Sequence, residues 1–185
     1  LIGRSLSFEM GERTDHRGRE LSPLNEHDLA HVAARLEDAA VEAVAICFLH
    51  SYADESHELA VETYLRDRLP NVFVCRSGDV LPQIREYERF TTTAFNAYLG
   101  PVVEGYLSHL QDRLRKGGYA RDLLLMTSNG GVISAEHASR YPVSTVLSGP
   151  AGGVSAGMVL GGALNIPDLI TCDMGGTSTD VSLIK

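Results

Sequence analysis

Two acids bracket a glycine-rich turn near the end of the chain, in the stretch "DMGGTSTD" (residues 173–180). Gly175 and Gly176 favour a turn whose backbone amides point outward, and the hydroxyl groups that follow can donate hydrogen bonds to phosphate oxygens. A carboxylate repels a bare phosphate, so Asp173 and Asp180 indicate either a hydrated magnesium ion or a base that accepts a proton from a nucleophile. The pattern therefore predicts phosphate chemistry, with the hydroxyl donors Thr177, Ser178 and Thr179.

A second glycine turn, "SGPAGG" (residues 148–153), precedes a stretch rich in Gly and Ala that is typical of a closely packed helix. Ser148 or Gly149 can cap this helix, and Pro150 suits its first turn. Such a start presents unpaired backbone N–H groups and the positive end of the helix dipole to an anion. The predicted anion-binding residues are Ser148, Gly149, Gly152 and Gly153. The same residues also fit an ordinary helix start packed against a sheet.

A third turn, "SNGG" (residues 128–131), also follows an apparent strand, and taken alone it fits an ordinary tight connection. In α/β sheets, however, the loops at the carboxyl ends of strands usually bind the ligand. The Walker A and G-x-G-x-x-G patterns are absent from the chain. Lys and Arg are also absent from residues 141–184, so a phosphate held here would depend on amides and a metal ion.

Extended and helical periodicities alternate along the first part of the chain. Leu6, Phe8 and Met10 alternate with polar residues and Gly11, which predicts a half-buried strand. The next expected elements are a helix from about Asn25, which either Asn25 or Ser22 can cap, a strand over 43–49, a helix over 55–69 and a strand over 72–75. This order predicts an α/β layer with parallel neighbouring strands.

The pattern changes near residues 77–85, which suggests a domain boundary, with domains over 1–84 and 85–185. The expected later elements are a long helix stopped by the pair Gly117-Gly118, strands in "DLLLM" and "YPVSTVL", the Gly/Ala-rich helix, and a final strand–turn–strand over 168–184.

Composition narrows the class of protein. Hydrophobic residues make up 44% of the 185, which is enough to fill a core. A net charge of -8 disfavours general binding to nucleic acid or an anionic membrane, and no signal peptide or apolar span is evident. We therefore expect a cytoplasmic protein without nucleic-acid or membrane partners. The chain begins at Leu1 and stops directly behind an expected strand, which suggests a segment of a longer protein.

Four blocks in order resemble the hydantoinase A/5-oxoprolinase family, and two upstream blocks resemble the end of its N-terminal domain. The resemblance covers nearly the whole chain. It implies a ribonuclease H-like, actin-like ATPase α/β fold, incomplete here, with mixed sheets flanked by helices. The four blocks are 85–101, 124–132, 143–154 and 173–184, and the upstream blocks are 8–24 and 43–58.

The resemblance implies an enzyme that uses ATP and Mg²⁺ to open a cyclic amide or imide, such as hydantoin or 5-oxoproline, together with a hydantoinase B-type subunit or domain. It assigns phosphate contact to Gly175, Gly176 and Thr177, and places Asp173 at the magnesium ion or a water. The role of Asp180, the other candidate catalytic acid, stays open. Two alternatives remain: the equivalent subunit of an ATP-dependent ketone carboxylase, and a non-catalytic chaperone-like nucleotide-binding module.

The chain departs from the family pattern in two places. Family members resemble a two-lobed ATPase with an earlier glycine-threonine phosphate loop and a later adenosine-contacting glycine segment, and neither is present in these 185 residues. We therefore expect the chain alone neither to hydrolyse ATP nor to open a ring. In "REYER", Arg85 or Arg89 can face an interdomain cleft or begin a solvated helix, and the role of Asn129 is open.

Overall fold

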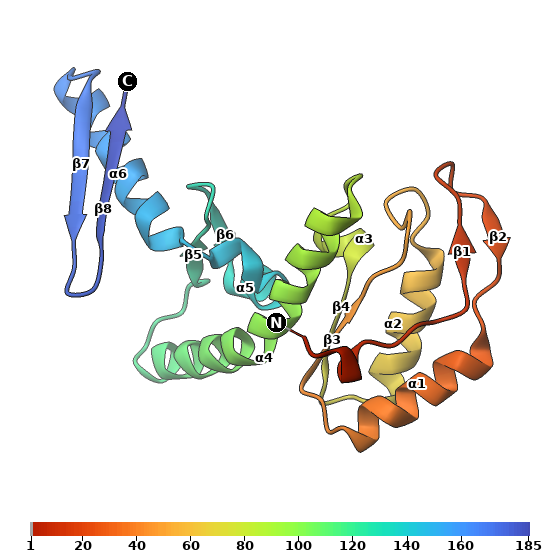
Figure 1. Cartoon of the computed structure of the whole chain (residues 1–185). Helices are drawn as coiled ribbons and strands as arrows, with labels where there is room; N and C mark the ends of the chain where they lie inside the picture. Colours follow the sequence, from red (N-terminus) through yellow and green to blue (C-terminus); the bar gives the residue numbers. More distant parts are fainter. Residues whose placement is uncertain (1) are drawn as a thin grey trace. The chain divides into compact units, whose positions relative to one another are not determined.

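The computed structural model describes residues 2–185, which form two compact units (Figure 1). One unit extends to Val103 and the other runs from Glu104 to Lys185. Each combines two-stranded sheets with flanking helices, as the predicted α/β class requires. The division between the units falls inside the long helix α4 (Glu86–Lys116), so this helix contributes residues to both units. The expected sequence boundary after residue 84 stays a prediction.

The first unit contains one antiparallel and one parallel strand pair. Strands β3 and β4 are parallel, with Ala43 opposite Phe73, as the alternation of strand and helix predicted. Strands β1 and β2 form an antiparallel hairpin that the sequence did not reveal. The elements are η1 (Arg4–Leu6), β1 (Arg13–Thr14), β2 (Glu20–Ser22), α1 (Glu26–Asp38), β3 (Ala43–Ile46), α2 (Ser56–Arg68), β4 (Phe73–Arg76) and α3 (Ser77–Val80).

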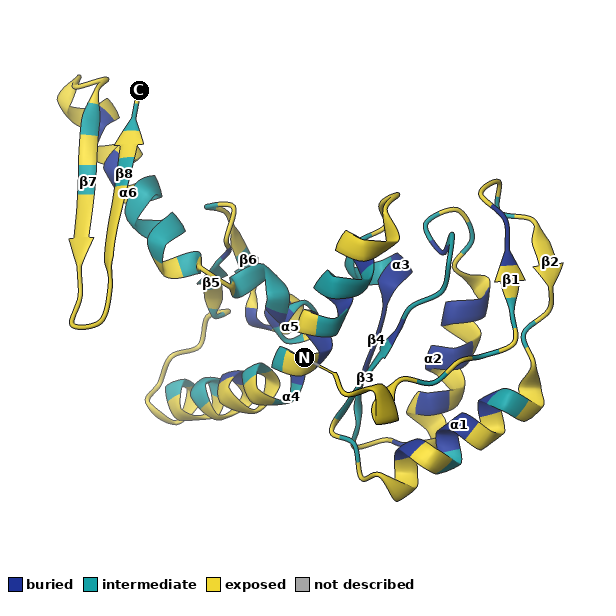
Figure 2. Ribbon diagram, viewed as in Figure 1, coloured by how far each residue is buried: buried dark blue, intermediate teal, exposed yellow. Residues whose placement is uncertain are grey.

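The core of the first unit lies between α1, α2 and the β3–β4 pair. Figure 2 shows the buried residues along these elements. Asn25 starts α1 as predicted, because its side chain accepts hydrogen bonds from the N–H groups of His27 and Asp28. The buried apolar residues are Leu29, Val32, Ala33, Leu36, Ile46, Val61, Leu65, Leu69 and Val74.

The predicted strand over Leu6, Phe8 and Met10 is wrong. A short 3-10 helix, η1, occupies Arg4–Leu6, and the following residues are irregular. Phe8 and Met10 nevertheless pack against the core, and the Arg35 guanidinium lies 4.6 Å from the Phe8 ring centroid. The alternation therefore indicated burial correctly for Phe8 and Met10 but not for Leu6, which is 46% exposed, and within residues 2–185 no strand pairs with this segment.

A buried polar network joins the residues that follow β3 and β4. Glu58 is 1% exposed and accepts hydrogen bonds from the N–H groups of Phe48 and Gly78 and from the Ser77 hydroxyl. Burial raises the pKa of Glu58, although these donors oppose the rise. The Ser77 hydroxyl oxygen also accepts a hydrogen bond from Arg89 Nε at 3.1 Å. The network therefore places a carboxylate and a guanidinium around one buried serine.

The hairpin β1–β2 is attached to α2 through one histidine. His57 is 8% exposed, with Nδ1 2.9 Å from Glu12 Oε2 and Nε2 2.9 Å from Glu20 Oε2. Burial alone would lower the pKa of His57, but the two carboxylates outweigh it and raise the pKa above its usual value. Protonated His57 can donate to both carboxylates at once, so it fastens the hairpin to the helix.

We expect stability of the first unit to fall as the pH rises. The folded-state pKa of His57 lies above the unfolded value of about 6.5. Its contribution is therefore fully present below about pH 6.5 and is lost as the pH rises through the folded pKa. Urea unfolding of the chain at a series of pH values between about 6 and 8.5 should show a falling midpoint.

The matched variant for this experiment is His57→Gln, which keeps one donor but does not titrate. The pKa of Glu58 is also raised in the folded state, so Glu58 likewise makes the protein more stable at lower pH, in wild type and in the variant alike. The difference between wild type and His57→Gln therefore isolates the histidine. Equal pH slopes for the two proteins would show that His57 does not contribute.

The second unit contains two antiparallel strand pairs. The Gly117-Gly118 pair ends α4 as predicted, with Gly118 at a φ of 88°. Strands β5 and β6 pair, as do β7 and β8. The elements are β5 (Leu124–Met126), β6 (Val132–Ser134), α5 (Ala135–Arg140), η2 (Pro142–Thr145), α6 (Ser148–Leu164), β7 (Leu169–Met174) and β8 (Thr179–Ile184).

The predicted strand in "YPVSTVL" is also wrong, because these residues form the 3-10 helix η2. Pro142 lacks the N–H that a strand ladder needs. Two hydroxyls then bond backwards: Ser144 Oγ donates to Tyr141 O at 2.7 Å and Thr145 Oγ1 to Pro142 O at 2.8 Å. These local bonds close the turn and override the β preference of the valines and threonine.

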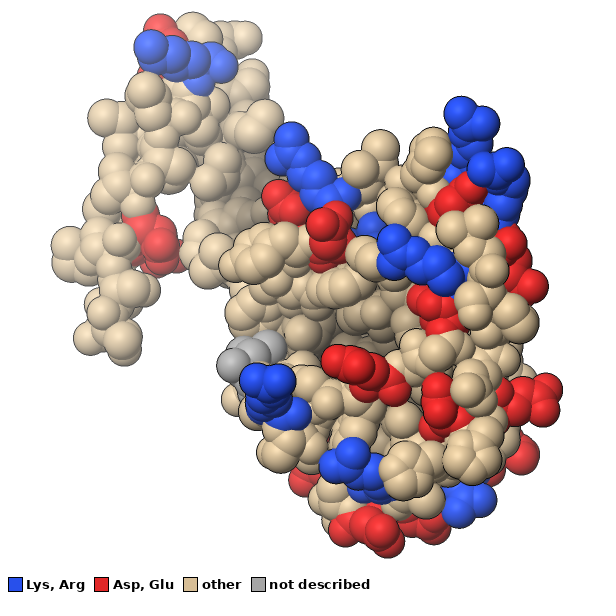
Figure 3. All heavy atoms as spheres, turned by 45° about the vertical axis from the view of Figure 1, so that its right-hand side comes forward, with Lys and Arg blue, Asp and Glu red and all other residues tan. Residues whose placement is uncertain are grey.

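Acidic and basic side chains are interspersed over the face of the molecule that Figure 3 shows, and the part formed by α6, β7 and β8 carries few of either. Within residues 2–185, no helix combines the length and the apolar character that crossing a bilayer requires.

Candidate functional site

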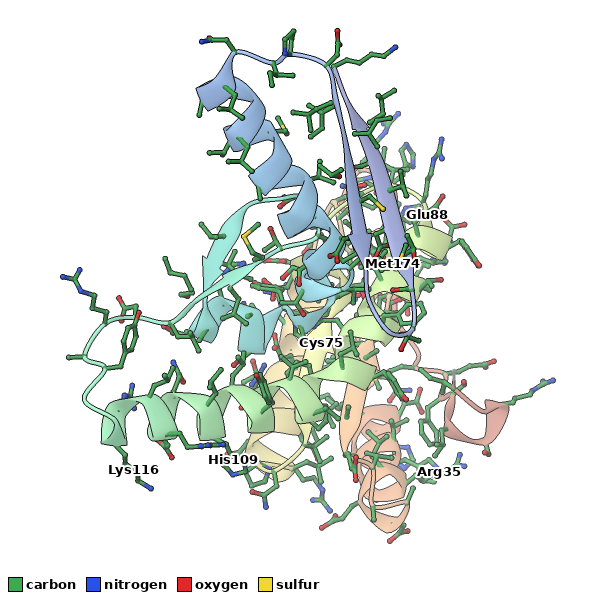
Figure 4. All side chains as sticks on the ribbon, turned by 90° about the vertical axis from the view of Figure 1, so that its left-hand side faces the viewer. Arg35, Cys75, Glu88, His109, Lys116 and Met174 are labelled. Carbon is green, nitrogen blue, oxygen red and sulfur yellow. The ribbon has the colours of Figure 1, made fainter. Side chains whose placement is uncertain are left out.

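The stretch "DMGGTSTD" forms the end of the β7–β8 hairpin, as the sequence predicted. Asp173 lies directly opposite Asp180 and Met174 opposite Thr179 in the antiparallel register. The turn that joins the strands comprises residues 175–178 and is closed by a 2.9 Å bond from Gly175 N–H to Ser178 O. Figure 4 shows Met174 near this end of the hairpin.

The two turn glycines are not required by the backbone conformation of the turn. Neither Gly175 nor Gly176 has a positive φ. A Cβ at Gly175 would make an ordinary 3.6 Å contact with Ser178 O, and a Cβ at Gly176 would meet nothing within 4 Å. The Gly175 N–H is used in closing the turn, so what the two glycines provide is a turn without side chains, which a group from outside the chain can approach closely.

Helix α6 packs against one face of the hairpin through small residues. A Cβ at Gly157 would lie 2.4 Å from Thr171 Cγ2, and one at Gly161 would lie 2.6 Å from Leu169 Cδ2. Side chains alternate along a strand, so Asp173 shares this face with Leu169 and Thr171. The opposite face is solvent-exposed, since Ile170 is 69% and Met174 75% exposed (Figure 2).

We expect Gly157→Ala to loosen this packing. The added Cβ would overlap Thr171 and Ile184, so the free energy of unfolding of the second unit should fall by about 1–3 kcal/mol. The control is Gly162→Ala on the same helix, where a Cβ meets nothing within 4 Å. Higher helix propensity should make that variant up to about 1 kcal/mol more stable. Denaturation curves that coincide for the two variants would contradict the packing.

Helix α6 begins two residues earlier than its proline suggested. Ser148 is the first helical residue, and the N-cap is Leu147, with a φ of 60° and no side-chain cap. The predicted capping role of Ser148 or Gly149 is therefore wrong. A left-handed conformation is costly for leucine, and such strain tends to occur at functional sites. The helix start remains uncapped by any side chain, as an anion-binding end requires.

A pocket of about 540 Å³ lies between the N-terminal half of α6, the hairpin and the turn after β5. Among residues 2–185, the charged residues that line it are Asp173 and Asp180. At this size the pocket falls within the range of small-molecule sites, about 300–1,000 Å³. The complete lining consists of Ser128, Leu147, Pro150, Ala151, Gly153, Val154, Thr171, Cys172, Asp173, Asp180, Val181 and Ser182.

The structure thus brings together residues from all three glycine turns. Of the predicted site residues, Asp173, Asp180 and Gly153 line the pocket. The other predicted residues flank it: Gly175, Gly176, Thr177, Ser178 and Thr179 at the exposed hairpin end, and Ser148, Gly149 and Gly152 in the first turns of α6.

The other lining residues were not among the predicted site residues, and three of them carry a hydroxyl group: Ser128, Thr171 and Ser182. Thr171 and Ser182 are cross-strand partners whose hydroxyls bond each other on the α6 side of the hairpin. Strand alternation from Asp173 and Asp180 gives a signal for both, because residues two apart share a face.

The two carboxylates fit a divalent cation that also binds phosphate. Like charges placed directly opposite each other on a sheet repel, and a cation would relieve that repulsion. Within residues 2–185, no cluster of three or more His, Cys, Asp or Glu side chains could hold a metal. Magnesium is commonly held by one or two carboxylates together with waters and substrate phosphates, so the donor set is compatible with that mode.

The fold and the site define a segment of the actin-like ATPase type of α/β protein, and the comparisons give its family. The chain belongs to the hydantoinase/oxoprolinase family: its model matches residues 89–185, and the model for the family's N-terminal region matches residues 1–69. The predicted fold class is thereby confirmed.

Three relatives are especially informative. The chain is 37% identical to caprolactamase subunit alpha of Pseudomonas jessenii, over all of this chain and 27% of that protein. The crystal structure of ATP-dependent caprolactamase from the same organism matches with a TM-score of 0.86. Nucleotide-free acetone carboxylase, from work on ATP-dependent acetone carboxylation, matches with a TM-score of 0.89 at 31% identity, over 100% of this chain and 26% of that one. 5-Oxoprolinase 1 of Arabidopsis thaliana is 34% identical, over 89% of this chain and 13% of that protein.

The chain therefore spans about a quarter of the length of the caprolactamase and carboxylase chains that it matches, and less of 5-oxoprolinase.

Proposed function

We propose that the full-length protein containing this chain is an ATP-dependent hydrolase that opens a cyclic amide or imide ring of the hydantoin or 5-oxoproline type. The observation that carries the proposal is the 540 Å³ pocket, because two acids that line it, Asp173 and Asp180, lie beside a glycine turn and the first half of α6. Membership of the hydantoinase/oxoprolinase family supports this reading of the pocket.

The chemistry has to overcome the stability of an amide, whose nitrogen donates electrons into the carbonyl group. Transfer of the γ-phosphoryl group of ATP to the carbonyl oxygen releases ADP and makes the carbon more electrophilic, because the phosphorylated oxygen withdraws electrons from the carbon and from the nitrogen. Water then adds to the carbon and the ring C–N bond breaks, with a proton going to nitrogen. A second water releases phosphate from the resulting acyl phosphate. One ATP is consumed for each ring opened.

The residues of the chain divide this work. The Gly176 amide and the hydroxyls of residues 177–179 bind the transferred phosphoryl group, whose charge spreads over its oxygens. Gly175, whose N–H closes the turn on Ser178 O, contributes by letting the phosphoryl group approach the turn closely. The start of α6, including Ser148 and Gly149, adds its partial positive charge to the site. Gly152 and Gly153 carry no side chain, so they leave room for the ligand beside the helix. When bound at Asp173, magnesium neutralises phosphate charge. Asp180, on the same face, accepts the proton of the attacking water.

Two alternative functions of the full-length protein remain to be tested. One is the equivalent subunit of an ATP-dependent ketone carboxylase, because the acetone carboxylase structure matches over the whole chain. The other is a non-catalytic nucleotide-binding module that uses the same turn to drive domain closure. We further propose that a hydantoinase B-type subunit completes the enzyme and that the 185-residue chain alone is inactive, since the caprolactamase relative is itself named as a subunit.

The discriminating experiment measures ATP turnover by the full-length protein with its partner subunit. Hydantoin and 5-oxoproline should each be tested alone, and acetone should be tested together with bicarbonate. Stimulation by a cyclic amide supports the proposal. Stimulation only by acetone with bicarbonate would replace it with the carboxylase alternative, and nucleotide binding without any stimulated turnover would favour the non-catalytic module.

A further inference from the structure

The third glycine turn, which follows β5, contributes Ser128 to the pocket that Asp173 and Asp180 line. Ser128 lies 45 residues before Asp173 in the chain, and neither the resemblance nor the phosphate chemistry gave it a role. Much of the rest of the pocket wall is apolar, with Leu147 and Val154 among the lining residues. A hydroxyl group in such a wall can fix the orientation of a small ligand.

The position of Ser128 is fixed by the rest of its turn. Asn129 Oδ1 accepts the N–H of Gly131 at 3.1 Å and the hydroxyl of Thr127. Gly130 has a φ of 81°, and a Cβ there would lie 2.8 Å from Ser155 Oγ on α6. The turn is therefore closed by Asn129 and seated closely on the helix, which makes Asn129 and Gly130 positioning residues for Ser128.

The hydrogen bonds of Ser128 determine what it can offer a ligand. Its hydroxyl donates to the backbone oxygen of Ser144 at 3.1 Å, and its N–H donates to the same oxygen at 2.8 Å. A serine hydroxyl has one hydrogen and two lone pairs. Because the hydrogen is committed to Ser144, the hydroxyl presents acceptor capacity. A phosphate oxygen is itself an acceptor, whereas an N–H group is a matching donor.

We propose that Ser128 accepts a hydrogen bond from the N–H group of the cyclic amide and so selects substrates whose reacting amide carries a hydrogen. This assignment rests on the proposed function. The Thr171 and Ser182 hydroxyls bond each other, and the two acids are assigned to the phosphate side. Phosphorylation of the carbonyl oxygen draws electrons from nitrogen and strengthens its N–H as a donor. The bond to Ser128 therefore stabilises the transition state more than the bound substrate.

The test compares matched substrates with the full-length protein and its partner subunit. The probes are hydantoin and 1,3-dimethylhydantoin, 5-oxoproline and its N-methyl derivative, and caprolactam and N-methylcaprolactam. Wild type should favour the N–H form in kcat/KM by at least about tenfold. Ser128→Ala should lower kcat/KM about tenfold for the N–H form, mainly through kcat, and leave the N-methyl form unchanged. Ser128→Cys keeps a side chain of similar size with a weaker acceptor. It should therefore lower the ratio of kcat/KM for the N–H form to kcat/KM for the N-methyl form, but by less than Ser128→Ala does.

The control is Thr145→Val, which removes a comparable hydroxyl-to-carbonyl bond, to Pro142 O at 2.8 Å, at a residue that does not line the pocket. It should leave the ratio unchanged. If Ser128→Ala lowers both substrate forms equally, its role is structural and the proposal is overturned. Absence of ATP-dependent ring opening in wild type would instead overturn the proposed function, and the Ser128 assignment with it.

Discussion

Asp173→Asn in the full-length protein is expected to lower ATP-dependent turnover by about 100-fold or more, because removal of one charged or polar group that stabilises a transition state costs about that much. Asp173 lines the pocket directly opposite Asp180 and next to the open glycine turn. Asn keeps the size of the side chain while removing its charge, and Asp180, the other acid of the pocket, is assigned to the attacking water.

The fold should survive this substitution. Asp173 is exposed, and replacing it relieves the repulsion between two acids that face each other across the hairpin, a difference of about 0.2–1 kcal/mol in favour of the variant. The control is Asp168→Asn, an exposed acid just before the other end of the hairpin, which should keep full activity. Steady-state turnover and circular dichroism of both variants measure the two expectations. Unchanged turnover in Asp173→Asn would remove Asp173 from the mechanism.

Arg89→Met is expected to lower the free energy of unfolding of the first unit by about 3–5 kcal/mol. Arg89 is 1% exposed and donates to Ser77 Oγ, to Gln83 O at 2.8 Å and to Phe48 O at 2.9 Å. Methionine fills similar space but leaves the buried Ser77 hydroxyl and the part-buried Phe48 and Gln83 carbonyls without this donor. It also removes the cation nearest to the buried Ser77–Glu58 pair, whose carboxylate is already costly to ionise.

The matched control lies one helical turn earlier. Arg85 has a side chain that is 79% exposed, and its contact with Glu88 is 3.7 Å long. Arg85→Met should therefore change stability by no more than about 0.5 kcal/mol. Urea denaturation of the chain, followed by far-UV circular dichroism, compares the two variants. Equal midpoints would show that the buried network does not hold the first unit together, and that Arg89 has another role.

These contacts distinguish the two arginines of "REYER" within the first unit, whereas a position of either at an interdomain cleft stays a prediction. Arg89 is a buried internal residue rather than a solvated one, and Arg85 is exposed with a φ of 79°. Sequence alone could not separate them, since both are arginines at the start of one helix. The difference arises from Ser77, Phe48 and Gln83, which reach Arg89 from other elements.

The sequence predicted correctly those helix ends and turns that depend on a few neighbouring residues. Asn25 fixed the start of α1, the Gly117-Gly118 pair fixed the end of α4, and the glycine turn fixed the β7–β8 hairpin. The segment before α6 failed because hydroxyl groups of Ser144 and Thr145 bonded their own backbone, which overrode the β preference of their neighbours.

The candidate site was predicted in parts. The acids and the hairpin turn followed from their residue types, and family resemblance gave their chemistry. Ser128 could not be placed beside Asp173 from the sequence, because their proximity depends on how α6 packs between the turn and the hairpin. That packing uses Gly157 and Gly130, where only the three-dimensional structure shows which neighbour a side chain would strike.

The central claim is that ATP hydrolysis and ring opening occur in the same catalytic cycle at the site that Asp173 and Asp180 line. The most direct measurement is the ratio of ADP formed to ring-opened product, by the full-length protein with its partner subunit and a cyclic amide that stimulates turnover. We expect one ADP for each ring opened, and no ring opening when ATP is withheld. Ring opening at an undiminished rate without ATP, or ADP formation without any opened product, would contradict it.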